Sequence, residues 1–201
     1  MNLYNIIIFI LGAYLLGSIH FGLIVGKTKG IDIRKDGSGN VGTTNVFRLL
    51  GKGWGTVVFI CDTLKGWIPV FLALHLTGSV TLAVLTAGAV ILGHTFSVFL
   101  KFKGGKGVAT GLGTIISLMP LLAAIVFIEF FVIFYLGRIV SLASLSAIGT
   151  LLVLVFATKQ PLALEIFVSL STLLIFYAHR SNIVRLFKGT ENKFGKARRT
   201  T

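Results

Sequence analysis

The sequence contains very little cysteine and little acid. Cys61 is its only cysteine, so no disulfide can form within these 201 residues. Cys61 sits in an apolar stretch, and we expect it to be a packed, unreactive thiol. Only 6 residues are Asp or Glu, and the 4 histidines are scattered, so the chain offers no metal-ligand spacing. We therefore expect neither a metal nor a cofactor.

Charged residues are also scarce, at 12% of the chain against 55% hydrophobic residues, and the mean hydropathy is +0.94. This balance excludes disorder, argues against an ordinary soluble domain and predicts an all-α polytopic membrane protein. A net charge of +13 would suggest nucleic-acid binding in a soluble protein. Here the cations crowd into loops and the C-terminal segment, where they meet anionic lipid headgroups. We expect membrane lipid, and no nucleic acid, as a partner.

Long apolar runs predict the membrane spans, because about 20 residues cross the bilayer core. A shorter run at about 108–118 is too short for a full crossing, and Pro120 separates it from the next run. The residues before the first run carry no basic segment, so this run is expected to be a retained helix rather than a signal peptide. The runs of adequate length cover roughly residues 3–25, 55–76, 80–100, 119–137, 139–158 and 161–179.

The positions of the cations predict the orientation of the chain, because cytoplasmic loops are rich in Lys and Arg. The 27–52 loop and the C-terminal tail are cationic, whereas the links at 76–80 and 157–161 carry almost no charge. The number of crossings between two cytoplasmic segments is even, so the run at 108–118 counts as a seventh, short span. The prediction is one domain over residues 1–201 with seven transmembrane helices, the N-terminus outside and the C-terminus cytoplasmic. The tail cations are Arg180, Arg185, Lys188, Lys193, Lys196, Arg198 and Arg199.

The first of two glycine-rich loops runs from Gly37 to Arg48 and reads GSGNVGTTNVFR. Its G-x-G-x-x-G spacing follows no strand, so it does not indicate a dinucleotide site. Glycines permit close approach of a ligand, the polar side chains offer hydrogen-bond donors, and Arg48 offers a bidentate fork for phosphate. The alternative is a solvated turn. The candidate residues are Ser38, Gly39, Asn40, Thr43, Asn45 and Arg48.

The second loop, from Lys101 to Thr110, reads KFKGGKGVAT and enters a short helix near Val108. A phosphate at this point would meet lysine charge, backbone amides and a helix N-terminus together. A flexible basic hinge on anionic lipid explains the lysines but not three glycines in four positions. The candidate residues are Lys101, Gly104, Gly105, Lys106, Gly107 and Thr110.

Further polar residues lie near the ends of the predicted spans. Arg138, Ser141 and Ser144 are spaced i, i+3, i+6, so the serines share roughly one helix face, where they would serve a polar substrate or allow close helix packing. His94, at a helix end, is expected to be a structural hydrogen-bond partner. The tail motif around His179 is either a third polar element or a cationic tail with an incidental histidine.

Two sets of ionisable residues fall within predicted spans, where charge is expensive. Asp62 and Lys65 are spaced i, i+3 and are expected to form an ion pair. Glu129 lies alone in an apolar stretch, where it is expected to be protonated or bonded to a neighbouring helix.

Three segments resemble the cytoplasmic motifs of the bacterial membrane acyl-phosphate:glycerol-3-phosphate acyltransferases. They are GSGNVGTTNVFR, GHTF with FKGGKGVAT, and HRSNIVRL with GTE, and the similarity extends over nearly the whole chain. Where the family often has proline, this chain has Ser97. The resemblance implies transfer of a fatty acyl group from acyl phosphate to the sn-1 hydroxyl of glycerol-3-phosphate. The products would be lysophosphatidic acid and phosphate, made in the first step of phospholipid synthesis at the cytoplasmic face of the bacterial inner membrane.

The resemblance also assigns roles to residues, and we expect a monomer. The expected catalytic residues are Ser38, Arg48, Lys106, Ser144, His179 and Asn182. The expected substrate-binding residues are Gly39, Asn40, Thr43, Asn45, Lys101, Gly104, Gly105, Gly107, Thr110, Arg138, Ser141 and Glu191.

The sequence lacks the His-x4-Asp pair that other glycerolipid acyltransferases use. Val25, Val80, Phe99 and Val184 stand where the aspartate would follow the histidines. An acyl phosphate does not need that base, because its carbonyl is already activated and the departing phosphate can accept the hydroxyl proton. The alternatives are a transporter of a phosphate-bearing anion or phosphorylated lipid, and a non-catalytic subunit that binds anionic lipid.

Overall fold

All regular secondary structure in residues 3–195, the part of the chain that the computed structural model describes, is helical. Lys196, Arg198 and Arg199 of the predicted cationic tail lie outside these residues. The helices are α1 (Leu3–Gly17), α2 (Phe21–Thr28), α3 (Thr43–Thr77), α4 (Val80–Thr95), the 3-10 helix η1 (Val98–Leu100), α5 (Val108–Leu118), α6 (Pro120–Gly137), α7 (Val140–Ala157), α8 (Leu162–Ala178) and α9 (Arg180–Phe187).

Each predicted apolar run is helical over most of its length. In the described chain, 5 helical segments are long and apolar enough to cross a membrane, namely Ile6–Thr28, Thr43–Thr77, Val80–Leu100, Pro120–Gly137 and Val140–Ala157. The helices α8 and α9, bent by 63° at their junction, pass the same test as a pair and raise the number to 6. The helix α5 is apolar but shorter. The all-helical membrane fold is confirmed, and seven crossings stay a prediction.

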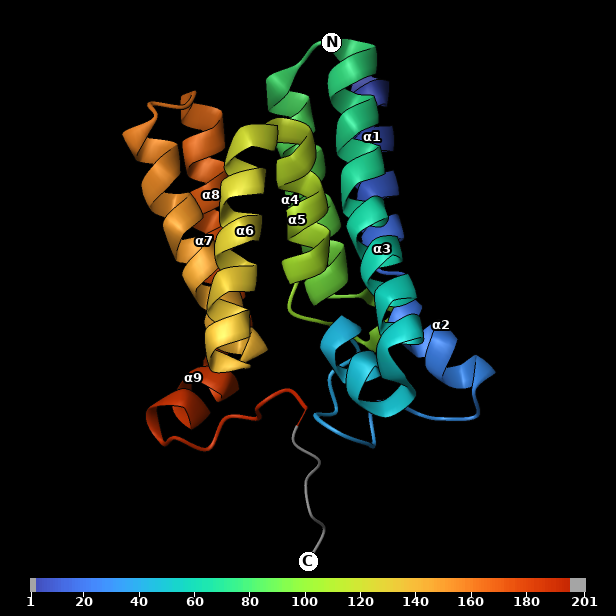
Figure 1. The fold of residues 1–201 in the computed structure, drawn as a ribbon. Helices are drawn as coiled ribbons and strands as arrows, with labels where there is room; N and C mark the ends of the chain where they lie inside the picture. The colour runs from blue at the N-terminus through green and yellow to red at the C-terminus, as the bar shows by residue number, and fades with distance from the viewer. Residues whose placement is uncertain (1–2, 196–201) are drawn as a thin grey trace, which may run out of the picture.

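The helix α3 begins well before the predicted boundary at residue 55. It starts at Thr43, so the second half of the first glycine loop is helical. Gly51, at φ +83°, interrupts the helical geometry and sets the first turns at an angle to the long part of α3 (Figure 1). A positive φ of this size favours glycine, which explains why the bend falls at this residue.

Glycines bring the membrane helices into close contact. A Cβ atom on Gly113 of α5 would overlap the α3 backbone, and one on Gly66 of α3 would overlap the α5 backbone at Thr110. Gly17 of α1 packs in the same way on Val90 of α4. Small residues allow such approach and increase van der Waals contact between membrane helices. As a result α1, α3, α4 and α5 form one tight group, with α6, α7 and α8 beside it (Figure 1).

Asp62, Lys65 and Glu129, the ionisable residues singled out within the predicted spans, all have partners. Lys65 Nζ lies 2.8 Å from Asp62 Oδ1, which confirms the predicted ion pair. Glu129 Oε1 accepts hydrogen bonds from Ser146 Oγ at 2.7 Å and from Thr150 Oγ1 at 2.9 Å. Bonding to the neighbouring helix α7, one of the two alternatives for Glu129, is therefore what the structure shows.

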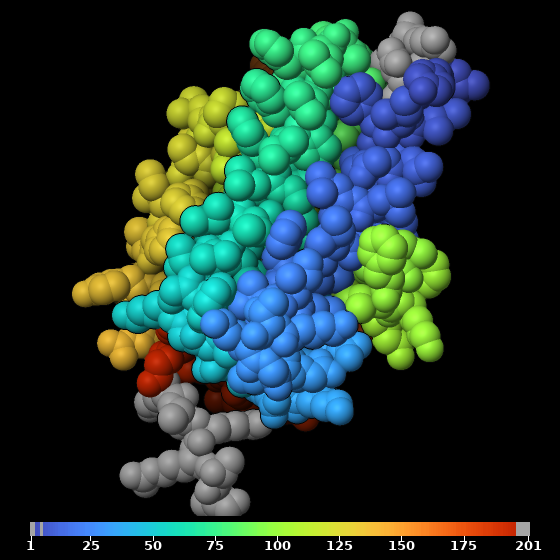
Figure 2. Space-filling view, turned by 90° about the vertical axis from the view of Figure 1, so that its right-hand side faces the viewer, coloured from blue at the N-terminus to red at the C-terminus, as the bar shows by residue number. Residues whose placement is uncertain are grey.

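The polar segments gather at one end of the helix bundle. Both glycine loops, the link between α6 and α7, and α9 all lie at this end (Figure 1). A separate apolar cluster of Val25, Ile33, Val41, Val46 and Val58 fixes the first loop to α2 and α3. The space-filling view shows the segment after α2 folded against the base of α3 (Figure 2).

Candidate active site

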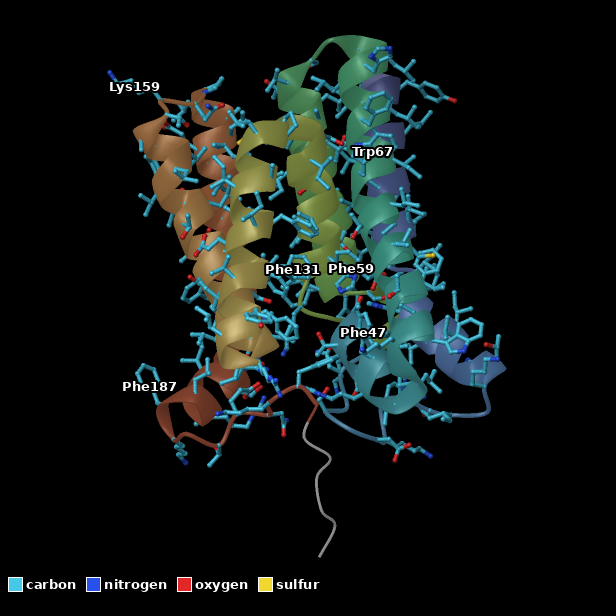
Figure 3. All side chains as sticks on the ribbon, viewed as in Figure 1. Phe47, Phe59, Trp67, Phe131, Lys159 and Phe187 are labelled. Atoms are coloured by element: carbon cyan, nitrogen blue, oxygen red, sulfur yellow. The ribbon has the colours of Figure 1, made fainter. Side chains whose placement is uncertain are left out.

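A cavity of about 500 Å³ lies between α3 and α5 on one side and α6, α7 and α8 on the other. Phe59 of α3 and Phe131 of α6 both line it, and they lie on either side of the gap between the two helix groups (Figure 3). The lining is polar where the glycine loops meet α9 and chiefly apolar toward the middle of the bundle. The polar end is lined by Ser38, Asn40, Thr43, Thr44, Asn45, Arg48, Lys52, Lys106, Ser141, Ser144, His179, Asn182, Arg185, Glu191 and Asn192.

A hydrogen-bond network joins the second loop to α7, α9 and the tail. Lys106 Nζ donates to Asn182 Oδ1 at 2.5 Å, and Asn182 Nδ2 donates to Glu191 Oε1 at 2.7 Å. Glu191 also accepts from Ser141 Oγ at 3.0 Å and from Arg185 Nε at 2.7 Å. Burial raises the pKa of Glu191, but these three hydrogen bonds outweigh it and hold the pKa below its usual value. The Glu191 carboxylate is thus ionised, and the hydrogen bonds that it accepts hold Asn182 in position.

Positive charge exceeds negative charge at this end of the cavity. Arg48, Lys52, Lys106 and Arg185 line it, and Glu191 is the acidic residue among them. Burial lowers the pKa of Lys106 to about 8; Glu191 opposes this shift, and Arg185 and Arg48 add to it. An arriving phosphate would compensate these cations and favour the charged lysine. The end of the cavity is therefore suited to a phosphorylated ligand.

His179 presents one ring nitrogen to the protein and leaves the other available. It lies between α8 and α9, is buried, and lines the cavity. Its Nδ1 lies 2.8 Å from the Ile175 carbonyl oxygen. Because a carbonyl oxygen only accepts hydrogen bonds, Nδ1 carries the proton and Nε2 of the neutral ring is an acceptor. The ring is suited to orienting a hydroxyl group.

The first loop is held together by Asn45, which was predicted to bind substrate. Asn45 Nδ2 donates to Ile33 O at 2.8 Å and to Asp36 O at 3.1 Å, while its Oδ1 accepts from Ser38 N at 2.9 Å. These bonds occupy the amide, so the structure gives Asn45 the role of shaping the loop. Thr43 Oγ1, by contrast, is buried without a hydrogen-bond partner in the described chain and belongs to the cavity lining.

The second loop uses two of its amides within the protein. Gly104 N donates to Thr95 O at 3.0 Å, and Gly105 N donates to His94 O at 2.9 Å. Contrary to the expectation, these N–H groups are not the free amides that a phosphate would meet. Lys106 and Gly107, the residue before α5, do line the cavity.

Several other candidates line the cavity with local hydrogen bonds of their own. Ser144 Oγ donates to Val140 O at 2.9 Å, one turn back in α7, so its oxygen remains an acceptor. Asn40 Oδ1 accepts from Gly42 N at 2.9 Å and shapes the turn that leads into α3. Both side chains are in reach of a ligand in the cavity.

The remaining predicted residues do not line the cavity. Thr110 is buried beneath it, with Oγ1 3.2 Å from His94 Nδ1, and Lys101 is exposed. The Arg138 carbonyl oxygen accepts from Phe194 N at 2.7 Å, which ties the tail to the α6–α7 link. The predicted residues outside the lining are Gly39, Lys101, Gly104, Gly105, Thr110 and Arg138.

The cavity has an aromatic wall that was not predicted from the sequence. Phe127, Phe130, Phe131 and Phe134 line it from α6, at the i, i+3, i+4, i+7 spacing of one helix face. The Phe194 ring lies 5.4 Å from Phe134 and 5.9 Å from Phe47 of α3. The tail thereby bridges the two helix groups at the polar end. The i, i+3, i+4, i+7 spacing of these phenylalanines could have indicated that they share one helix face. Because the other faces of α6 are apolar as well, the spacing did not show which face lines a cavity.

No group of three His, Cys, Asp or Glu side chains in residues 3–195 could hold one metal ion. Fold and site together are those of an integral-membrane protein whose cavity pairs a cationic end with an apolar interior, as a phosphorylated lipid requires.

Comparisons with known proteins place the chain in a family of this class. The sequence model of the family described as glycerol-3-phosphate acyltransferase matches residues 7–189. The chain is 48% identical over 191 residues to the glycerol-3-phosphate acyltransferase of Geotalea daltonii, covering 94% of this chain and 97% of that one. It is 45% identical over 183 residues to that of Aquifex aeolicus, covering 90% and 95%.

Solved structures of PlsY, an integral membrane glycerol 3-phosphate acyltransferase, are similar over the same extent. The glycerol 3-phosphate form has a TM-score of 0.92 at 43% identity and covers 95% of this chain and 96% of that chain. The lysophosphatidic acid form has a TM-score of 0.89. The chain belongs to the glycerol-3-phosphate acyltransferase family.

Proposed function

We propose that this protein transfers a fatty acyl group from acyl phosphate to the sn-1 hydroxyl of glycerol-3-phosphate, giving lysophosphatidic acid and phosphate. The observation that carries the proposal is the cavity with two chemically different ends. Its cationic end is suited to substrate phosphates, and its apolar part is suited to a fatty acyl chain. Family membership and the solved glycerol 3-phosphate and lysophosphatidic acid forms of a relative support the same substrate and product.

The chemistry requires little more than orientation and charge. The glycerol hydroxyl oxygen attacks the acyl carbon, the bond from that carbon to the phosphate oxygen breaks, and the hydroxyl proton passes to the departing phosphate. Lys106 and Arg48 hold phosphate groups, and Asn182 aims the Lys106 ammonium through their 2.5 Å hydrogen bond. His179 Nε2 is positioned to accept the hydrogen bond of the attacking hydroxyl. Ser38, Thr43 and Ser144 complete the polar lining.

A covalent acyl-enzyme has no support in this geometry. The Ser144 hydroxyl donates to the Val140 carbonyl at 2.9 Å, so it is bonded away from a base. His179 uses Nδ1 on a backbone carbonyl rather than on a carboxylate, so the orienting partner of a catalytic triad is missing from the described site. Direct transfer between the two substrates is the proposed course.

Transport of a phosphate-bearing anion fits the cavity less well. A transport path needs polar residues toward both faces of the membrane. Here the cations collect at one end, while Leu151, Phe167 and Val168 line the other part of the cavity and are buried.

The orientation proposed for the chain follows from its charges. Seven crossings, with α5 as a short span, place the N-terminus outside and both glycine loops, α9 and the tail on the cytoplasmic side. The α1 helix starts at the end opposite to this polar cluster, in agreement with an odd number of crossings (Figure 1). The proposed location is the bacterial inner membrane, and the proposed state is a monomer.

Transfer of labelled glycerol-3-phosphate into lipid by the purified protein tests the function. Acyl phosphate, acyl-CoA and acyl carrier protein are offered as donors in separate reactions. We expect labelled lysophosphatidic acid and released phosphate with acyl phosphate alone. Product with acyl-CoA but not with acyl phosphate would refute the donor, and no product with any donor would refute the reaction.

A further inference from the structure

We propose that His94 is a positioning residue for Lys106, and that Gly104 and Gly105 are required because they pack on His94 rather than because they bind phosphate. The proposal rests on the proposed function only in taking Lys106 as the residue that holds a substrate phosphate. It gives His94 a role in positioning Lys106. It also explains the presence of Gly104 and Gly105 by their packing on His94 instead of by phosphate binding.

His94 contacts the second loop on both sides of Lys106. On the N-terminal side, its carbonyl oxygen accepts from Gly105 N at 2.9 Å, next to the bond from Gly104 N to Thr95 O at 3.0 Å. On the C-terminal side, its Nδ1 lies 3.2 Å from Thr110 Oγ1 in the first turn of α5. His94 is 3% exposed and lies at the end of α4, so it is a fixed point to which both flanks of the loop are tied.

The two glycines meet different parts of this residue. A Cβ atom on Gly105 would overlap the His94 ring, and its three nearest atoms, Nε2, Cδ2 and Cε1, all belong to that ring. A Cβ atom on Gly104 would instead overlap the His94 carbonyl oxygen and crowd that of Thr95. Neither glycine has a positive φ, so steric exclusion, and not backbone conformation, is what demands glycine at these positions.

The ring of His94 is held from its other side as well. The His20 ring lies 5.0 Å away, in an edge-to-face arrangement. Nδ1 lies against Thr110 and Nε2 lies next to Gly105, where His94 borders the cavity. The packed His94 ring therefore fixes the position of the loop that carries Lys106 relative to the end of α4. Contact with the substrate is left to His179.

A rescue experiment separates packing from phosphate binding. Gly105→Ala, His94→Ala and the double variant are purified, and kcat and KM are measured for glycerol-3-phosphate and acyl phosphate. We expect Gly105→Ala to lower kcat/KM between about tenfold and a hundredfold, as a displaced binding group does. Removal of the ring makes room for the new methyl group, so we expect the double variant to be as active as His94→Ala. A double variant that loses the product of the two single losses would overturn the proposal.

Gly104→Ala provides the matched control. Its obstacle is main chain, which no side-chain substitution removes, so His94→Ala should not rescue it. If His94→Ala rescued Gly104→Ala and Gly105→Ala equally, the rescue would come from a general loosening of the loop. That result would contradict a specific contact between Gly105 and the His94 ring. His94→Gln, which keeps a hydrogen-bonding group near Thr110, should retain more activity than His94→Ala. If His94→Gln and the double variant are inactive but show the wild-type melting temperature, His94 acts on substrate and the proposal fails.

The same variants are compared by their thermal stabilisation with glycerol-3-phosphate, which does not require turnover. The inference predicts the same order of effects in this binding assay. Wild-type protein that gives no product but shows this order would refute the proposed reaction and leave the role of His94 supported.

Discussion

Raising the pH past 8 should remove the charge of Lys106 and with it the binding of a substrate phosphate. The buried environment lowers the pKa of Lys106 to about 8, from an ordinary 10.5. A lysine is charged below its pKa, so the substrate-free enzyme is competent below pH 8 and loses competence above it. Each pH unit beyond the pKa lowers the protonated fraction, and therefore kcat/KM, by about tenfold.

The acidic side of the same profile belongs to the substrate. The dianion of a phosphate monoester takes up a proton near its second pKa of ~6, which weakens its attraction to cations. The highest kcat/KM is therefore expected between these two pKa values. Bound phosphate stabilises the ammonium form of Lys106, so kcat at saturating substrate should decline at a higher pH than kcat/KM does.

The assay is initial-rate transfer of labelled glycerol-3-phosphate across this pH range, with Lys106→Arg as the test variant. A guanidinium stays charged throughout, so the alkaline decline should disappear even if the overall rate is lower. Lys101→Arg, at an exposed lysine outside the cavity lining, should keep the wild-type profile. A wild-type kcat/KM that stays constant up to two pH units above the pKa of Lys106, or an unchanged decline in Lys106→Arg, would refute the reasoning.

Three other substitutions test separate parts of the structure. Asn182→Ala removes the acceptor of Lys106 at 2.5 Å, and should lower kcat/KM by roughly ten- to a hundredfold, the equivalent of about 1.5–3 kcal/mol for a charged hydrogen bond, in steady-state assays. Leu151→Trp should fill the buried apolar part of the cavity and shift the preference toward shorter acyl phosphates; an unchanged chain-length profile would show that Leu151 does not border the acyl chain. Glu129→Ala should lower the free energy of unfolding by about 1 kcal/mol, because the hydrogen bonds from Ser146 and Thr150 of α7 are lost, and should leave KM unchanged. A wild-type melting curve for this variant would contradict the expectation.

Much of the fold was predictable because a membrane constrains sequence strongly. The apolar runs located the helices, since the backbone of a spanning segment must satisfy its own hydrogen bonds. The charge asymmetry predicted that both loops and the tail share one end, and the structure places them together (Figure 1). The ion pair of Asp62 and Lys65 followed from helical spacing alone.

The sequence predicted which residues belong to the site better than it predicted what each residue does there. Lys106, His179 and Asn182, which the resemblance implied to be catalytic, line the cavity, and their catalytic roles stay a prediction. Gly104 and Gly105 were expected to offer amides to phosphate, but those amides bond to the end of α4. A sequence shows that a glycine is present, and only the neighbours show whether a ligand or another part of the protein excludes a side chain there.

Taken alone, the sequence determined the helical membrane class, the cationic end and the family resemblance, because these depend on local composition, periodicity and motif spacing. The tertiary structure decided which polar groups meet. Ser141 bonds to Glu191, 50 residues further along the chain, and Lys106 bonds to Asn182, 76 residues further along. Hydrogen-bond partners at such distances are set by how the helices pack, and packing depends on side-chain shapes throughout the bundle rather than on any one segment.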